Sequence, residues 1–313
     1  MAKSNILVTG SLGQIGSELV TALNQKFSPD AVLSSDIQTP PAGYPNEFAL
    51  LDVTDPEKLE NCIHKHSITT IYHLVSLLSA TGEKDPQKAW QVNIGSLKTV
   101  LDLAVKYHLK VFWPSSIAAF GPNTPKDQTP QDTIMQPTTM YGVTKVAGEL
   151  LCQYYHQKYG VDIRSLRYPG IISWKTEPGG GTTDYANYMF FKAVKNEAYV
   201  CFLSKDTQLP MMYMDDAIKA TLDLMAAPAE KLTVWTSYNL SAFSFTPERL
   251  HAEISRHLPF SVTYSPDFHQ PIADSWPHSI DDSVARRDWN WSPEYNFSRF
   301  VTVMLKFLKS PHV

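Results

Sequence analysis

A tyrosine and a lysine stand four residues apart in the segment Tyr141-Gly142-Val143-Thr144-Lys145. On a helix, this separation places the phenol and the ammonium on one face, where the cation favours the phenolate. A phenolate can take the proton of an alcohol, although at pH 7 to 8 a tyrosine pKa of about 10 must be offset by roughly 3 to 4 kcal/mol of differential stabilisation. Lys145 and a cationic cofactor ring can supply this together. Tyr141 is therefore the candidate general base.

The same spacing occurs twice more, in Tyr154 with Lys158 and in Tyr188 with Lys192, because both residue types are common. The first of these pairs lies further along the same expected helix, which turns it about 220° away from Tyr141. The second pair falls away from the strand ends that should hold a cofactor. Position, rather than spacing, therefore favours Tyr141.

A hydroxyl that could work with this tyrosine follows the expected strand Lys110–Trp113, in Ser115-Ser116. Ligands of parallel sheets bind outside the carboxyl ends of the strands. A serine at a strand end can simply cap the next turn. With Tyr141 and Lys145 downstream, we expect Ser116 to hold the substrate oxygen beside the tyrosine.

Three glycines at regular spacing, Gly10, Gly13 and Gly16, separate the apolar run Ile6–Thr9 from a segment with helical spacing of apolar residues. Glycines at such a turn let the backbone approach a pyrophosphate, and the start of the helix offers unpaired N–H groups and a positive dipole end. The alternative is a tight turn without a ligand, which needs one glycine and not three. We therefore predict a dinucleotide site here that also includes Gln14 and Ile15.

An acidic residue, Asp36, ends the second expected strand twenty residues after Gly16. There its carboxylate can accept hydrogen bonds from both adenosine ribose hydroxyls and would repel a 2′-phosphate. Ile37 and Gln38 follow in place of an arginine, so NAD is favoured over NADP. Asp36 could instead only begin the turn toward Pro40. Weaker signals at later strand ends place further cofactor contacts at Asp52, Val53, Leu74 and Val75.

Strands and helices that alternate along the chain must position these residues. Strands that are apolar on both faces, alternating with helices, indicate the α/β class with a doubly wound parallel (Rossmann) sheet. The expected strands are 31–35, 70–74, 110–113 and 163–168, and the expected helices are 55–66, one through residues 90–101, and 141–159, with Gly160 as the stop.

This alternation breaks after Pro169, where residues 171–213 are predicted to be rich in loops. A helix over 214–225 and a strand over 234–240 should return to the main sheet. We therefore expect an NAD-binding domain of residues 1–170 with 214–240. A smaller C-terminal substrate-binding lobe should consist of residues 171–213 and 241–313.

Composition and charge exclude other classes of function. The 313 residues are 43% apolar and 19% charged with a net charge of −4, and they contain no long run of like charges. An electrostatic footprint for nucleic acid or an anionic membrane is therefore missing. Three widely separated cysteines suit neither a disulfide framework nor a zinc site. The start resembles no targeting peptide, and no stretch reaches the ~18 apolar residues of a membrane span. We expect a soluble cytoplasmic protein without a metal, acting on a small molecule.

Taken together, these residues resemble the extended short-chain dehydrogenase/reductase family. The resemblance rests on the glycine turn, Asp36, Asn93, Tyr141 with Lys145, and the segments 114–121 and 167–170. It implies Ser116 as the residue that positions the hydroxyl, Tyr141 as the base, Lys145 on the nicotinamide ribose, and Asn93 and Tyr168 at the cofactor. It also implies a homodimer formed through a four-helix bundle.

Within that family, the run 178–186, Pro-Gly-Gly-Gly-Thr-Thr-Asp-Tyr-Ala, together with Trp113-Pro114-Ser115-Ser116, is similar to the short-chain L-threonine 3-dehydrogenases. This likeness implies NAD-dependent oxidation of the C3 hydroxyl of L-threonine to 2-amino-3-oxobutanoate. We expect Ser76, Gly180 and Thr182 around the substrate carboxylate and ammonium, with Ser116 and Tyr141 at the reacting hydroxyl. The glycine-threonine run could instead be a flexible crossing between lobes.

Two other functions remain open. A nucleotide-sugar epimerase or dehydratase would share the fold, although such proteins usually carry an asparagine where Pro169-Gly170 stands here. A binding module that senses NAD without turnover would typically have lost the tyrosine or the lysine. Release of free NADH during turnover distinguishes the dehydrogenase from both.

Overall fold

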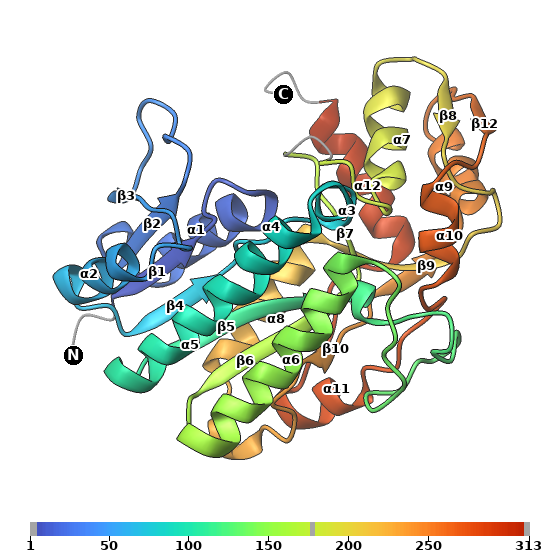
Figure 1. Ribbon diagram of the computed structural model, residues 1–313. Helices are drawn as coiled ribbons and strands as arrows, with labels where there is room; N and C mark the ends of the chain where they lie inside the picture. Colours follow the sequence, from blue (N-terminus) through green and yellow to red (C-terminus); the bar gives the residue numbers. More distant parts are fainter. Residues whose placement is uncertain (1–4, 176–178, 310–313) are drawn as a thin grey trace. The chain divides into compact units, whose positions relative to one another are not determined.

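The computed structural model describes residues 5–175 and 179–309 (Figure 1). The chain divides into two compact units. The first contains residues 1–115, 144–166 and 220–238, and the second contains residues 116–143, 167–219 and 239–313. The division expected from the sequence differs mainly at 116–143, which packs with the second unit. As a division between NAD binding and substrate binding, it stays a prediction.

A parallel sheet of seven strands in the order β10-β6-β5-β4-β1-β2-β3 confirms the predicted doubly wound class (Figure 1). From β1 the chain adds β2 and β3 on one side, and it then crosses back to add β4, β5 and β6 on the other side. The strand order therefore reverses between β1 and β4. The strands are β1 Ile6–Thr9, β2 Val32–Asp36, β3 Phe48–Leu50, β4 Thr70–His73, β5 Lys110–Ser116, β6 Ile163–Tyr168 and β10 Tyr238–Asn239.

Helices connect these strands at nearly the predicted positions. They are α1 Gln14–Lys26, η1 Pro29–Ala31, α2 Pro56–His66, α3 Ser79–Lys84, α4 Pro86–Trp90, η2 Gln91–Gly95, α5 Ser96–Tyr107, η3 Ile117–Ala119, α6 Met140–Tyr159, α8 Met214–Ala226 and η4 Ala229–Lys231. Asp55 caps α2 by accepting the Lys58 N–H at 3.1 Å, and Gly160, with a φ of +70°, follows the end of α6. The helix predicted through residues 90–101 is divided by a π-helical turn, η2.

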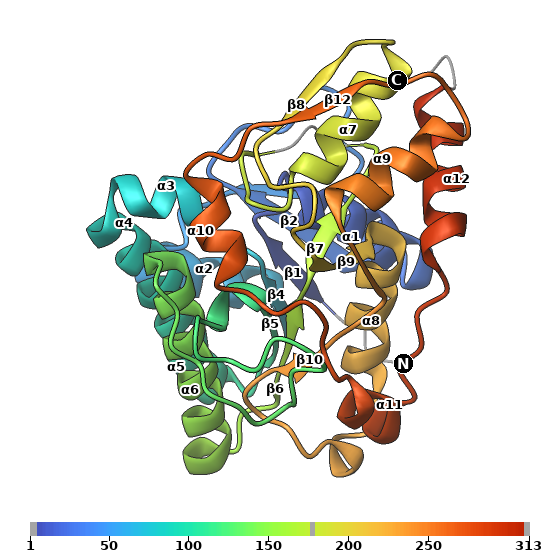
Figure 2. The same ribbon diagram turned by 90° about the vertical axis from the view of Figure 1, so that its right-hand side faces the viewer.

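The main apolar core of the first unit lies on one face of the sheet, beneath α2, α5 and α6 (Figures 1 and 2). Inward residues of the strands, such as Leu7, Ile71 and Val111, meet Leu59 of α2 and Leu101 of α5 there. Helix α1 lies on the opposite face (Figure 2). Covering both faces explains why strands such as β1 and β6 are buried at every residue and show no alternation of buried and exposed side chains.

The second unit has more regular structure than the sequence indicated. Residues 171–213 were predicted to be rich in loops, but the described part of this segment contains one helix, two strands and most of a third strand that begins at Gly170. Its elements are β7 Gly170–Ile172, α7 Tyr185–Val194, β8 Tyr199–Cys201, β9 Leu209–Tyr213, β11 Phe243–Phe245, α9 Pro247–Ser255, β12 Val262–Tyr264, α10 His269–Asp274, α11 Ser283–Trp289 and α12 Phe297–Leu308. They form two small sheets, β11-β9-β7 and β12-β8.

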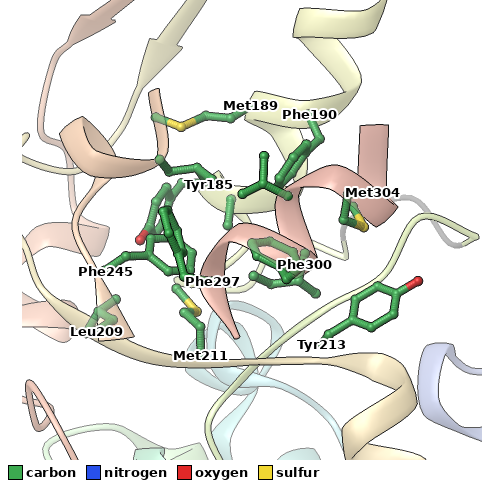
Figure 3. Packing of buried hydrophobic residues seen from close by; sticks show 14 of the residues in the cluster. Tyr185, Met189, Phe190, Leu209, Met211, Tyr213, Phe245, Phe297, Phe300 and Met304 are labelled. Carbon is green, nitrogen blue, oxygen red and sulfur yellow. The ribbon is translucent and has the colours of Figure 1, made fainter. Parts of the chain in front are cut away.

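An aromatic core holds this unit together (Figure 3). Phe190 of α7 packs edge-on against Phe300 of α12 with ring centroids 5.3 Å apart, and Phe245 of β11 lies 5.2 Å from Phe297. Buried aromatic pairs of this geometry contribute about 0.5–1.5 kcal/mol each beyond the area they bury. Residues from distant parts of the sequence supply this core, which is why periodicity within 171–213 did not predict it.

The predicted strand 234–240 is shorter than expected and covers only Tyr238–Asn239. The Tyr238 hydroxyl accepts the N–H groups of Thr233 at 2.9 Å and Val234 at 3.2 Å, and these bonds fold the preceding residues into a turn. In the part of the chain that the structure describes, no helix combines the length and the apolar character needed to cross a membrane. The expected cytoplasmic location stays a prediction.

Candidate functional site

A cavity of about 450 Å³ opens at the carboxyl ends of the strands of the first unit, where the strand order reverses. Ligands of doubly wound sheets bind at this place. Its lining comes from the turns after four strands and from α4 and η2, and consists of Gly10, Gly13, Asp36, Ile37, Gln38, Leu51, Asp52, Val53, Thr54, Leu74, Val75, Ser76, Leu77, Lys88, Gln91 and Val92.

The glycine turn is built for close backbone approach. Gly10 has a φ of +72°, a conformation that favours glycine, and a Cβ on Gly16 would lie 2.2 Å from the Gly10 carbonyl oxygen. No side chain of the described residues caps the start of α1, so the first N–H groups of this helix can face an anion. The buried Ser11 Oγ and Gln14 Nε2 have no hydrogen-bond partner among the described residues. These features fit a dinucleotide diphosphate. Gln14, Ile15 and Gly16 are absent from the cavity lining.

Asp36 lines the cavity at the end of β2. Its Oδ2 accepts the Leu12 N–H of the glycine turn at 3.2 Å, and its Oδ1 accepts the Gln38 N–H at 3.2 Å. Asp36 therefore does begin a turn, as the alternative reading held, and it also faces the cavity. Each carboxylate oxygen can accept a further hydrogen bond, so a ribose diol fits beside it. No arginine stands in the lining where a 2′-phosphate would need one.

Asn93 holds the loop after β4. It comes from the π-helical turn η2, is 2% exposed, and bonds the N–H and the carbonyl oxygen of Leu77 at 2.7 and 3.0 Å. Its Nδ2 also donates to Thr144 Oγ1 of α6 at 3.1 Å. Leu77 lines the cavity, so Asn93 shapes the cavity through the backbone and is not itself part of the lining. Ser76, expected near the substrate, lines this same cavity, and its buried Oγ has no hydrogen-bond partner in the described part of the chain.

A histidine that the sequence reasoning did not identify, His73 at the end of β4, is fully buried. Its Nδ1 and Nε2 lie 2.9 Å from Thr9 Oγ1 and Ser96 Oγ. Because Ser96 uses its proton on the Val92 carbonyl, Nε2 must donate and Nδ1 must accept. Burial, with the nearby Lys145 charge, lowers the pKa of His73 to about 3, so the ring is neutral.

Lys145 of α6 is 2% exposed. Its Nζ donates to the Pro114 carbonyl oxygen at 2.7 Å and lies 4.6 Å from the centre of the Trp113 ring. Burial lowers the pKa of Lys145 to about 7, and Glu149 on the same helix raises it in part. Lys145 is thus an ammonium whose charge state is sensitive to its neighbours near neutral pH.

In the second unit, Tyr141 at the start of α6 forms a side-chain hydrogen bond with Ser116. The Ser116 oxygen accepts the Ala118 N–H at 3.2 Å, so its proton can be directed at the tyrosine. Burial raises the pKa of Tyr141 to about 12, and the bond with Ser116 opposes that rise. The Ser116 hydroxyl thus lies beside Tyr141, and the functions expected of the two residues stay predictions.

The glycine-threonine run begins at Pro178, which lies outside the described residues. Gly179, Gly180 and Gly181 direct their N–H groups at the Asp184 carboxylate, with Gly181 at 2.6 Å. Burial raises the pKa of the Asp184 carboxyl group. Asp184 was not among the site residues predicted from the sequence. Thr182 is 2% exposed, and its Oγ1 has no partner among the described residues. A buried hydroxyl and a buried carboxylate therefore stand together at the start of α7.

Tyr168, expected at the cofactor, is buried in β6. Its hydroxyl lies 3.5 Å from the Ala217 carbonyl oxygen of α8. The first-unit cavity is lined by eight of the predicted cofactor or substrate residues: Gly10, Gly13, Asp36, Asp52, Val53, Leu74, Val75 and Ser76. The functions expected of all the site residues stay predictions.

Comparisons with known proteins agree with the sequence and the fold. The model of the NAD dependent epimerase/dehydratase family matches residues 6–240. An uncharacterized epimerase/dehydratase of Staphylococcus haemolyticus is 50% identical over 309 residues, 97% of each chain. The holo form of a GalE-like L-threonine dehydrogenase from Cupriavidus necator matches with a TM-score of 0.96 and 52% identity, covering 97% of this chain and 99% of that one.

A second similar structure is a monomeric L-threonine 3-dehydrogenase from a metagenome, in its apo form. Its TM-score is 0.95 and its identity 49%, over 97% of this chain and 98% of that one. The predicted resemblance to extended short-chain dehydrogenases and the prediction of NAD are confirmed. The family model matches residues 6–240, and relatives are about 50% identical along nearly the whole chain. The protein is an enzyme that uses NAD and acts on a small molecule. The chain belongs to the NAD-dependent epimerase/dehydratase family.

Proposed function

We propose that this enzyme oxidises the C3 hydroxyl of L-threonine to 2-amino-3-oxobutanoate. The observation that carries the proposal is the hydrogen-bonded pair of Ser116 and Tyr141, with Lys145 following one helical turn later on α6. Such a set can hold an alcohol oxygen and remove its proton, which NAD sensing alone does not require. The relatives from C. necator and the metagenome, both described as L-threonine dehydrogenases, support the choice of substrate.

In this proposal Tyr141 is the general base. Its pKa of about 12 must fall to about 8 before the phenolate is populated, which requires roughly 5 kcal/mol of differential stabilisation. Ser116 contributes by donating to the phenolate oxygen, and Lys145 contributes its positive charge. NAD, when bound, supplies the hydride acceptor and a further positive charge in its nicotinamide ring. When the substrate binds, Ser116 would turn its proton to the substrate oxygen and so orient the substrate hydroxyl toward Tyr141.

Residues that line the first-unit cavity would hold the cofactor, together with the rest of the glycine turn and Lys145. The turn Gly10–Gly16 with Gln14 and Ile15 would receive the diphosphate, Asp36 the adenosine ribose, and Asp52 with Val53 the adenine. Leu74 and Val75 would line the path toward the nicotinamide. Asn93 would fix that path through Leu77, and Lys145 would bind the nicotinamide ribose. A contact of Tyr168 with the cofactor remains part of the proposal inferred from the family resemblance.

For the amino-acid part of the substrate, we propose the start of α7. The Thr182 hydroxyl, buried and without a partner among the described residues, suits the substrate carboxylate. Asp184 is anionic when deprotonated and suits the ammonium. The Gly180 N–H already faces Asp184, so Gly180 would act mainly by keeping that carboxylate in place. Ser76 of the first unit, whose buried Oγ has no partner among the described residues, remains a proposed contact of the substrate.

The test is NADH formation with a panel of substrates. L-threonine should be oxidised well, and L-serine, which lacks only the methyl group, should be oxidised poorly. D-threonine and 3-hydroxybutyrate should hardly react, because a site that bonds both charged groups rejects analogues that lack or misplace one of them. UDP-glucose should give neither NADH nor an epimer. Epimerisation of a nucleotide sugar without net NADH would favour the epimerase function, and faster oxidation of a simple secondary alcohol than of L-threonine would contradict the substrate.

A homodimer is proposed from the same resemblance. Helix α6 exposes Leu150, 55% exposed, next to the partly exposed Ala147, and apolar side chains on such a face favour association. Light scattering of the parent protein and of Leu150→Glu tests this. A parent dimer that dissociates in the variant supports it. A parent monomer, the state named for the metagenome relative, contradicts it.

A further inference from the structure

The end of β5 contacts α6 at each residue from Trp113 to Ser115. The Trp113 indole lies against Gly148, where a Cβ would come within 2.3 Å of it, and beneath the Lys145 ammonium. The Pro114 carbonyl accepts from Lys145, and Ser115 Oγ donates to Glu149 Oε1 at 2.5 Å. All of these residues lie in the first unit. Among the ionisable members of this set, Lys145 has a part in the proposed function and Glu149 has none.

Glu149 is fully buried. A carboxylate in such surroundings is costly unless hydrogen bonds and an opposite charge compensate it. Ser115 supplies a hydrogen bond, and Lys145 stands four residues earlier on the same helix, on the same face. The strand contacts of the two side chains, Pro114 for Lys145 and Ser115 for Glu149, are adjacent residues. The carboxylate and the ammonium are thus held as a pair against one strand end.

Two other titratable groups of the first unit interact electrostatically with Lys145, and both are neutral. His73 from β4 has its pKa lowered to about 3, so its ring carries no charge near pH 7. Cys152, one turn beyond Glu149 on α6, has a thiol pKa raised well above its usual value by burial. The strand residues Trp113, Pro114 and Ser115 do not titrate. Glu149 is therefore the group among these that can balance the Lys145 charge.

We propose that Glu149, held by Ser115, is a positioning residue that keeps Lys145 protonated and directed at the end of β5, so that its charge can act on Tyr141. The effect of Lys145 on Tyr141 rests on the proposed function. The pairing of Glu149 with Lys145 does not depend on that function. The two parts can be tested separately.

The expected effect of losing the carboxylate follows from charge. Glu149→Gln keeps the shape of the side chain and an acceptor for Ser115, and removes only the negative charge. Burial then acts on Lys145 without this balance, and its pKa falls below about 7. If turnover needs the charged lysine, activity is lost as the pH rises through that pKa. The alkaline limb of kcat/KM should therefore move to lower pH in the variant.

The first measurement needs no substrate. In protein labelled with ¹³C at the lysine ε-carbons, the Lys145 signal, assigned by its absence in Lys145→Arg, reports the lysine titration midpoint. We expect Glu149→Gln to lower that midpoint by about one pH unit or more, roughly tenfold in the proton affinity. Ser115→Ala should lower it less, and Glu149→Asp, which keeps the charge, should restore most of it.

The matched control is Glu60→Gln. Glu60 also accepts from a hydroxyl, Tyr107 at 2.6 Å, and pairs with a lysine, Lys106, but it lies on α2. Its variant should leave the Lys145 midpoint and the pH profile unchanged. An unchanged midpoint in Glu149→Gln overturns the proposal. If that variant does not fold, an unchanged midpoint in Ser115→Ala overturns it instead.

The second measurement is the pH profile of NADH formation from L-threonine. A lowered midpoint together with an alkaline limb at lower pH supports both parts. A lowered midpoint with an unchanged limb overturns the part that links Glu149 to Tyr141. Absence of threonine turnover in the parent protein contradicts the proposed function, while the NMR midpoint still decides the pairing.

Discussion

Asn93 binds both backbone groups of Leu77, accepting its N–H at 2.7 Å and donating to its carbonyl oxygen at 3.0 Å. One side chain from the π-helical turn thereby fixes the loop that lines the cofactor cavity. A third bond, to Thr144 at 3.1 Å, connects the same side chain to α6. The turn, the loop and the helix are consequently held by a single amide.

Replacing this amide tests its contribution. Asn93→Ala leaves the buried Leu77 and Thr144 groups without their partner, so the free energy of unfolding should fall by about 2–4 kcal/mol. The dissociation constant for NAD should rise several-fold, because the loop is no longer fixed. Urea unfolding and calorimetric titration measure the two effects. Asn24→Ala, which breaks the Asn24–Asn46 pair elsewhere in the first unit, should destabilise the protein without weakening NAD binding.

The cofactor preference should depend on Asp36. Asp36→Ala removes the acceptor for the ribose diol and the charge that repels a 2′-phosphate. The ratio of kcat/KM for NAD to that for NADP should shift toward NADP by at least about 1 kcal/mol, the scale of one charge-assisted hydrogen bond. The comparison needs both dinucleotides with one substrate. An unchanged ratio would place the adenosine ribose elsewhere.

A steric prediction concerns the glycine turn. Gly16→Ala would place a Cβ 2.2 Å from the Gly10 carbonyl oxygen, so the turn must shift and NAD binding should weaken at least tenfold. Gly95→Ala is the matched control, because nothing lies within 4 Å of its added Cβ and its backbone is helical. It should stabilise the fold by about 0.5–1 kcal/mol. Equal NAD affinity in both variants would contradict close packing at Gly16.

The buried neutral His73 predicts how stability depends on pH. Its folded pKa of about 3 lies below the unfolded value of 6.5, so between these values the unfolded state binds more protons. The contribution of His73 is therefore complete above about pH 6.5 and is lost as the pH falls. Between pH 7.5 and pH 5 this loss is about 2 kcal/mol. Urea unfolding of the parent and of His73→Gln should show a correspondingly smaller pH dependence in the variant. Equal slopes would mean that His73 does not remain neutral.

Local sequence signals predicted much of the first unit. Asp55 and Gly160 mark helix ends through their own side-chain or backbone chemistry, and the glycine turn lies at the first strand-to-helix junction. The π-helical turn was missed, because one extra residue in a turn barely alters the apolar spacing through Ile94 and Leu97.

Contacts over long sequence distances were not predictable. Asn93 acts on the backbone of Leu77, which no residue type reveals. His73 reads as one more strand residue until Thr9 and Ser96 are seen beside it. The helix Tyr185–Val194 depends on packing against Phe300, which lies more than a hundred residues later.

The proposed mechanism depends most on Tyr141, and Tyr141→Phe tests this residue directly. The variant keeps the ring and removes the only atom of that side chain that can take the alcohol proton. NADH formation from L-threonine should fall by about 100-fold or more, while the dissociation constant for NAD stays close to that of the parent. Tyr154→Phe, which has the same lysine spacing on the same helix but an exposed side chain, should retain activity. Near-normal turnover in Tyr141→Phe would contradict the assignment of the base and, with it, the proposed mechanism.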